Sequence, residues 1–212
     1  MKTVLKKIVV MLVLCMSLAS SLGFVSADAA TKMTKTVKKA MNKAYKKKLK
    51  KLFNSYKKDE YITEFAMWYS YSDIDGDGID EMITMKAFAS GFDSTAYIMK
   101  IYKYIDGKII DMTKKVEIYL TTFDFANNYD YIFTEFQGDS LEVDIYKRSG
   151  NYYKKVAFYF DGEETVFELY DKKTKGLKEV PEADFWAYCD KNLKKSVEEE
   201  LEWTEYGYWP AE

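Results

Sequence analysis

Apolar residues recur at helical spacing in a lysine-rich segment near the start of the chain. Between Thr34 and Tyr56 they occupy every third or fourth position and form one row: Val37, Met41, Tyr45, Leu49, Leu52 and Tyr56. That spacing places them on a single stripe of an α-helix, and lysines fill most of the other positions. The pattern predicts a basic amphipathic helix within residues 28–58.

After residue 59 the pattern changes to short apolar stretches separated by turn residues. Asp106-Gly107, Ser149-Gly150 and Asp161-Gly162 are typical of hairpin turns. We therefore predict an antiparallel meander sheet of about seven to nine strands over residues 59–175. The expected strands span 65–71, 82–88, 97–104, 108–112, 116–122, 129–135, 141–148, 152–160 and 165–170.

The last part of the chain returns to helical spacing. Pro181 fits the first helical position, and apolar residues then follow at steps of four: Phe185, Cys189, Leu193 and Val197. The pattern predicts a second amphipathic helix over 180–202, to about Leu201. An aromatic tail, 203–212, contains Trp203, Tyr206, Tyr208 and Trp209, and we expect it to pack on the sheet. The prediction is one α+β domain over 28–212.

The first segment, residues 1–27, is typical of a secretory signal peptide. Three lysines precede an uninterrupted apolar run from Ile8 to Leu14, and small residues around Ala27 and Ala29 fit a cleavage site. The run is too short for a membrane span, which leaves an uncleaved anchor as the weaker alternative. We expect a secreted or cell-surface protein. Cys189 would then be the only cysteine, without an internal disulfide and buried as a small apolar residue.

Charge is segregated along the chain. Residues 28–58 contain twelve lysines and one acid, for a net charge of +11, whereas residues 59–212 contain 17 basic and 33 acidic residues, for a net charge of −16. The basic helix could bind an anionic cell-wall polymer or lipid headgroups, or it could be a solvated face that complements the acidic body. We favour the solvated face. Nucleic acid is not expected as a partner of an exported, acidic protein.

One acidic motif carries candidate chemistry. Residues 73–81 read Asp-Ile-Asp-Gly-Asp-Gly-Ile-Asp-Glu, with two glycines that permit the positive φ of a tight turn. Asp73, Asp75 and Asp77 alternate, so one turn can direct all three carboxylates to the same point, where a hard cation would relieve their repulsion. Oxygen ligands of this kind select Ca²⁺. The alternative is an acidic turn without a metal.

The motif resembles known calcium loops. Its beginning is similar to the EF-hand pattern D-x-D-x-D-G, but Thr84 stands at the twelfth position, where an EF-hand has Glu. The acid at the ninth position, Glu81, makes it more similar to the loops of integrin-type propellers. The flanking segments are predicted strands, so the motif is a strand-loop-strand and not a helix-loop-helix. Because it occurs once, a propeller with repeated blades is excluded. Residues 38–90 resemble secreted, largely uncharacterised proteins of Gram-positive bacteria, and this resemblance implies a calcium-stabilised extracellular α+β domain without implying an activity.

The predicted ligands of one Ca²⁺ ion come from this loop alone. They are the side chains of Asp73, Asp75, Asp77 and Glu81 and the carbonyl of Ile79. We expect the Ile79 side chain to point into the core and Asp80 to face solvent or a donor outside the ligand shell.

The composition limits the possible functions. The chain has no His, which excludes catalytic triads, Cys-His pairs and His-ligated metals. The first hypothesis is a non-enzymatic, exported module in which calcium is structural. The second is a carbohydrate or cell-wall binder that uses Tyr and Trp. The third is a glycoside hydrolase with two carboxylates, for which the sequence singles out no pair.

Overall fold

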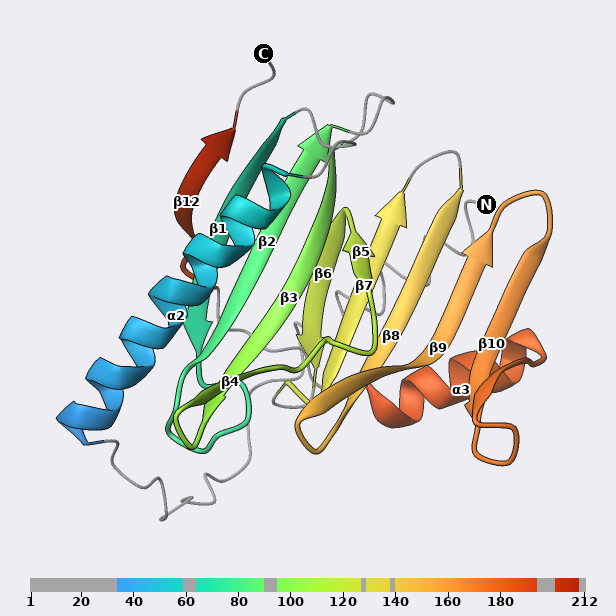
Figure 1. Cartoon of the computed structure of the whole chain (residues 1–212). Helices are drawn as coiled ribbons and strands as arrows, with labels where there is room; N and C mark the ends of the chain where they lie inside the picture. Colours follow the sequence, from blue (N-terminus) through green and yellow to red (C-terminus); the bar gives the residue numbers. More distant parts are fainter. Residues whose placement is uncertain are drawn as a thin grey trace, which may run out of the picture.

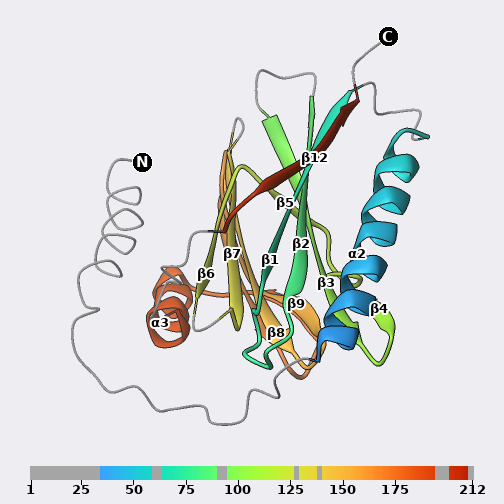
Figure 2. The same ribbon diagram turned by 90° about the vertical axis from the view of Figure 1, so that its left-hand side faces the viewer.

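Two antiparallel sheets packed face to face form the centre of the protein (Figures 1 and 2). The computed structural model describes residues 34–58, 64–89, 95–126, 129–137, 140–193 and 201–209. Helix α2 (Lys35–Tyr56) covers the outer face of the first sheet, and helix α3 (Glu182–Asn192) covers that of the second. The layer order is helix, sheet, sheet, helix, which agrees with the predicted α+β class.

The first sheet holds the acidic motif and has the strand order β12-β1-β2-β3-β4, with β5 also paired to β3. Its β1–β2 hairpin carries residues 73–80 as the connection. The strands are β1 (Phe65–Ser72), β2 (Glu81–Ala89), β3 (Thr95–Ile105), β4 (Lys108–Asp111), β5 (Ile118–Leu120) and β12 (Thr204–Trp209).

The second sheet is a meander with the order β11-β10-β9-β8-β7-β6. The chain passes into it at Thr121, whose N–H donates to the Glu135 carbonyl at 2.6 Å directly after β5 ends. The strands are β6 (Thr122–Ala126), β7 (Tyr131–Gln137), β8 (Leu141–Ser149), β9 (Tyr152–Asp161), β10 (Thr165–Asp171) and β11 (Gly176–Glu179).

The prediction of a single meander sheet of about seven to nine strands was wrong in the number of sheets and strands. The described residues contain twelve strands in two sheets. The stretch predicted as one strand over 116–122 is divided at Thr121 between the two sheets. The predicted aromatic tail is largely strand β12, which pairs with β1 from Phe65↔Trp209 to Tyr69↔Thr204 and completes one edge of the first sheet. Tail residues Tyr206 and Trp209 pack on the core, as expected.

Helix α2 forms where its apolar stripe predicts. Thr34 caps its start, with the hydroxyl accepting a hydrogen bond from the Val37 N–H at 3.3 Å. Met41, Tyr45 and Leu49 are buried against the first sheet. The Tyr45 hydroxyl lies 3.0 Å from the Asp80 carbonyl and 3.2 Å from the Tyr102 carbonyl. The helix is thereby fixed both to the acidic loop and to β3.

Helix α3 is shorter than the predicted helix. It ends at Asn192, because the Leu193 backbone (φ −108°, ψ 59°) leaves the helical region. Leu201, predicted to be helical, instead packs with Trp203 on the core between the two sheets. Both side chains are partly buried at this position. Val197 lies outside the described residues, and so does the predicted signal segment, 1–27. No described helix is both long enough and apolar enough to cross a bilayer.

The thiol of Cys189 is expected to be unreactive in the native protein. Its side chain is 2% exposed among Phe185, Tyr159 and other apolar residues, and burial raises its pKa to about 12. In a chain starting at Asp28, Ellman's reagent should therefore release no colour at mildly alkaline pH. The same sample in guanidinium chloride should react at once, and rapid reaction without denaturant would contradict the burial.

Candidate metal centre

The acidic motif forms the β1–β2 connection at one end of the space between the sheets. Gly76 (φ 71°) and Gly78 (φ 81°) both adopt left-handed backbone conformations that other residues rarely accept. Two isoleucines anchor the loop on opposite sides. Ile74 is fully buried in the core between the sheets, and Ile79 is half-buried against the core beneath α2. The loop is therefore held from both faces of the first sheet.

Two of the aspartates shape the loop through its own backbone. The Asp73 carboxylate accepts hydrogen bonds from the Asp77 N–H at 3.1 Å and the Gly78 N–H at 2.8 Å. Asp77 accepts one from the Ile79 N–H at 2.9 Å. These bonds turn the chain around the carboxylates, as Asp commonly does in turns. They leave further lone pairs of the same oxygens available to a ligand.

Glu81 is the least exposed acid of the motif. Its side chain is 0% exposed, and its Oε2 accepts a hydrogen bond from the Ile74 N–H at 3.0 Å. Its Oε1 is also buried and makes no hydrogen bond of good geometry, although it lies 3.2 Å from the Lys103 ammonium. Burial, followed by the charge of Asp75, raises the Glu81 pKa to about 8, while Lys103 opposes the shift.

Three carboxylates of the motif converge. Asp73, Asp75 and Glu81 each offer one oxygen, and these oxygens all lie within 4.8 Å of one another. One oxygen of Asp75, Oδ1, is buried without a hydrogen-bond partner. Buried carboxylate oxygens without such partners are costly unless a cation compensates them. The donor set therefore fits a hard divalent ion.

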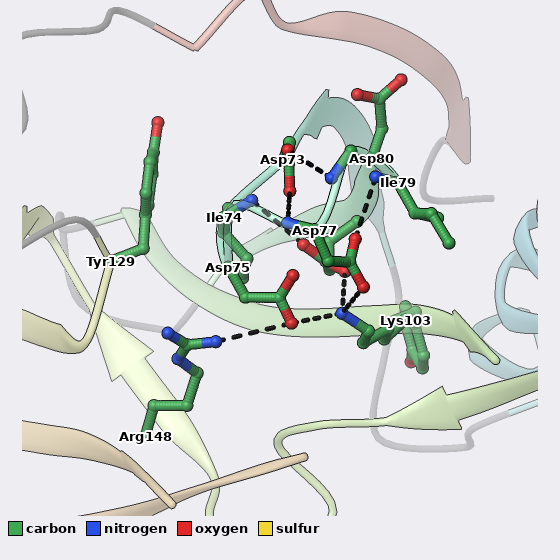
Figure 3. Close-up of polar contacts among 12 residues, drawn as sticks. Asp73, Ile74, Asp75, Asp77, Ile79, Asp80, Lys103, Tyr129 and Arg148 are labelled. Carbon is green, nitrogen blue, oxygen red and sulfur yellow. Dashed lines mark hydrogen bonds and ion pairs between the residues drawn. The ribbon is translucent and has the colours of Figure 1, made fainter. Parts of the chain in front are cut away.

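A lysine from the neighbouring strand enters the same cluster. The Lys103 ammonium donates to the Asp75 carboxylate and to Asp77 Oδ2 at 2.6 Å (Figure 3). Its side chain is only 6% exposed. Burial alone would lower the Lys103 pKa, but the hydrogen bonds to Asp75 and Asp77 raise it above the usual range. Lys103 is thus a permanent counter-ion within the candidate site.

An arginine from the second sheet reaches the cluster from the opposite side. Arg148, on β8, lies 3.4 Å from Asp75 Oδ2 (Figure 3). It also donates a hydrogen bond to Asp130 Oδ1 at 2.8 Å. Asp75 is therefore shared between a lysine of one sheet and an arginine of the other. Four acidic side chains face one ammonium and one guanidinium that is already paired with Asp130, so negative charge remains in excess even when Glu81 is protonated below its raised pKa.

The predicted ligands separate into two groups. Asp73, Asp75 and Glu81 come together, whereas the Asp77 side chain is 40% exposed and is bound to Lys103. The ligand role of the Ile79 carbonyl stays a prediction. Figure 3 shows the Asp80 side chain directed away from Lys103 and Asp75.

Lys103 and Arg148 are not among the site residues predicted from the sequence. The sequence contains one indication of the role of Lys103. Met99, Ile101 and Lys103 are alternate residues of one strand and so lie on the same face, and Met99 and Ile101 face the core between the sheets. A lysine in phase with buried strand positions needs a buried carboxylate partner. No comparable signal marks Arg148, since its approach depends on how the two sheets pack.

Two grooves are present among the described residues. One, of about 580 Å³, runs between the start of α2 and the acidic loop, and Val37, Asp77, Lys103 and Asp106 contribute to its walls. The other, of about 460 Å³, lies at the open end of the two sheets and is aromatic, with Trp68, Tyr97, Phe123 and Trp203 among its lining residues.

The fold and site define a two-sheet antiparallel domain with a carboxylate-rich hairpin loop that a buried lysine closes. The chain matches no known protein-family model, and comparison with curated proteins and with solved structures finds no significant match to either. The geometry of this chain is therefore the only basis for inferring its function.

Proposed function

We propose that the chain is an exported, non-enzymatic protein whose β1–β2 loop binds one calcium ion for a structural purpose. The observation that carries the proposal is the convergence of Asp73, Asp75 and Glu81 oxygens within 4.8 Å, at a cluster with excess negative charge. Calcium would neutralise this charge and hold β1 and β2 in their hairpin. Asp77 and the Ile79 carbonyl are the further ligands that the motif supplies.

The proposal is tested by thermal unfolding of the chain from Asp28 onward, which contains every described element. Melts are recorded with Ca²⁺, with Mg²⁺ and with EDTA. Extracellular calcium modules typically bind at about 10⁻⁴–10⁻³ M. Calcium at about tenfold above the dissociation constant should stabilise the fold by about 1.4 kcal/mol, which raises the melting temperature by about 3–6 °C. Mg²⁺ should have a smaller effect.

A double substitution, Asp75→Asn with Asp77→Asn, should remove this calcium response. The matched control is Asp106→Asn with Glu163→Gln, which removes two charges from exposed turns outside the motif. The control should respond to calcium as the unchanged chain does. A calcium response that persists in the double variant, or is absent from the unchanged chain, would sink the proposal.

Glycan binding is the second candidate function, and the aromatic groove favours it. Tryptophan and tyrosine rings are common sugar-stacking surfaces because their faces are apolar and polarisable. The rings in this groove, however, are not coplanar: Trp68 and Tyr97 are tilted by 55°, and Phe123 and Trp203 are nearly perpendicular. Trp203→Ala should abolish retention on insoluble peptidoglycan if this groove binds glycan, and unchanged retention would exclude it.

The hydrolase hypothesis gains little support among the described residues. Glu81 has the raised pKa that a general acid needs, but its side chain is completely buried and lines neither groove. A glycosidase needs two carboxyl groups open to the substrate. We therefore propose a binding function for this chain and not a hydrolytic one.

A further inference from the structure

The solvent face of α2 is covered by lysine side chains. Among its exposed residues there is no carboxylate, no aromatic ring and no arginine. The exposed lysines of the helix and its end are Lys35, Lys38, Lys39, Lys43, Lys46, Lys47, Lys50, Lys51, Lys57 and Lys58. Figure 2 shows the helix as an outer layer of the molecule, so this face is presented to solvent along its whole length.

Five of these lysines form a regular row. Lys35, Lys39, Lys43, Lys47 and Lys51 follow one another at steps of four residues. Four residues of α-helix rise by about 6 Å and turn by about 40°, so the row runs obliquely across the solvent face and places one positive charge about every 6 Å over about 24 Å of helix length. Like charges at this spacing destabilise a helix. Lysines in the first turn, which has no acid, also oppose the helix dipole.

The acidic body does not neutralise this row. No ion pair between described residues joins an α2 lysine to a carboxylate, so these lysines are solvated and not paired with the acidic body. Lys57 lies over the Phe53 and Trp209 rings instead, and Lys48, half-buried over Tyr102, is near the charge of Asp111. The ammonium groups of the row are therefore accessible to an anion from outside the chain.

The burial of α2 decides between the possible anionic partners. A helix that lies in a membrane surface inserts its apolar face, but here Met41, Tyr45 and Leu49 are buried against the first sheet. Val37 is the only large apolar residue of α2 that is exposed, at 38%. Single-stranded nucleic acids are usually held by aromatic stacking as well as charge, and the exposed face offers no ring. A flexible polymer whose charges repeat along a line fits better.

We propose that the α2 lysine row binds an extended polymer that bears regularly spaced phosphate groups. The binding is electrostatic, follows the oblique row across the solvent face of the helix and does not use the calcium loop. The acidic remainder of the chain, with a net charge of −16 over residues 59–212, repels the same polymer and therefore restricts it to the helix.

The test measures binding of the chain from Asp28 onward to linear inorganic polyphosphate at several salt concentrations. The helix variant replaces Lys35, Lys39, Lys43, Lys47 and Lys51 by Gln, which keeps helix propensity. The matched control replaces five exposed lysines elsewhere by Gln: Lys114, Lys172, Lys173, Lys178 and Lys191. Both variants lose the same charge, so the comparison separates the row from net charge.

The unchanged chain and the control should bind with similar affinity, and the helix variant should bind at least about tenfold more weakly. Each phosphate contact adds about 0.7 to the magnitude of the negative slope of log K against log salt. Loss of five lysine contacts should therefore reduce the magnitude of this slope by about three to four in the helix variant. Equal weakening in both variants, or no binding by the unchanged chain at low salt, would overturn the proposal. Tighter binding to phosphatidylglycerol vesicles or to single-stranded DNA than to polyphosphate would overturn it as well.

Discussion

Replacing Lys103 by methionine is expected to destabilise the calcium-free protein by about 3–5 kcal/mol. The substitution keeps an unbranched side chain only one atom shorter but removes the ammonium that contacts Asp75, Asp77 and Glu81. Asp75 is mostly buried, so its charge would be left without the main counter-ion, and Glu81, whose pKa is already raised to about 8, would take up a proton. The cost of an unpaired buried charge exceeds what the apolar side chain gains.

Calcium should reverse most of this loss. In the unchanged chain the ammonium occupies the position toward which the carboxylate oxygens point, so a divalent ion must bind beside it or displace it. A divalent ion and an ammonium bound to the same carboxylates repel each other. Lys103→Met should therefore bind calcium more tightly than the unchanged chain and should show a larger stabilisation by it. The variant is expected to be less stable in EDTA and nearly normal in calcium.

Urea denaturation in EDTA and in calcium measures both effects. Lys100→Met is the matched control, because it makes the same substitution on β3, three residues away and outside the acidic cluster. Lys100→Met should change little in either buffer. If Lys103→Met is as stable as the unchanged chain in EDTA, Lys103 is not the counter-ion. If it is destabilised but calcium does not restore it, the counter-ion role stands and the calcium site is refuted.

Truncating Tyr45 to alanine is expected to cost about 3–5 kcal/mol of stability. This side chain is completely buried between α2 and the first sheet, and its ring packs against Tyr71 and Tyr104. The alanine variant leaves a large cavity beneath the helix. Tyr45→Phe keeps the ring and removes only the hydroxyl that lies by the Asp80 and Tyr102 carbonyls, so it should cost about 1–2 kcal/mol.

Chemical denaturation of both variants gives these values, with Tyr119→Ala as a control at a ring that is 43% exposed. The order of stability should be unchanged chain, Tyr45→Phe, then Tyr45→Ala, with Tyr119→Ala near the unchanged chain. Hydrogen exchange should quicken in α2 more than in β8 of the second sheet. Equal loss for Tyr45→Ala and Tyr119→Ala would mean that α2 is not docked through Tyr45.

Local patterns predicted the individual elements well. The stripe of Met41, Tyr45 and Leu49 gave the position of α2 because a helix with one apolar face has one way to bury it. Turns such as Asp106-Gly107 marked hairpins because their backbone conformation is set by a few residues. The acidic loop was found for the same reason, since most of its geometry comes from nine consecutive residues.

Contacts between distant segments were not predictable in this way. The chain changes sheets at Thr121 without any local signal of turn chemistry, because both β5 and β6 satisfy the same strand pattern. Strand β11 contains two charged residues in four and has no alternation to detect. The approach of Lys103 and Arg148 to one carboxylate requires knowledge of which sheet faces which. Pairing of sheets is decided by total burial over both faces, which no short window contains.

The pairing of β12 with β1 has a consequence for how the chain reaches its final state. These strands lie at opposite ends of the described chain, yet they are neighbours in the sheet (Figure 1). During synthesis, β1 emerges early and β12 emerges after every other strand, so the β1 edge stays open until the rest of the protein can already be formed. An open edge of apolar and aromatic residues is a template for aggregation. Release of a chain that stops before Thr204 would therefore expose the full length of this edge on an otherwise nearly complete molecule, and self-association would compete with folding.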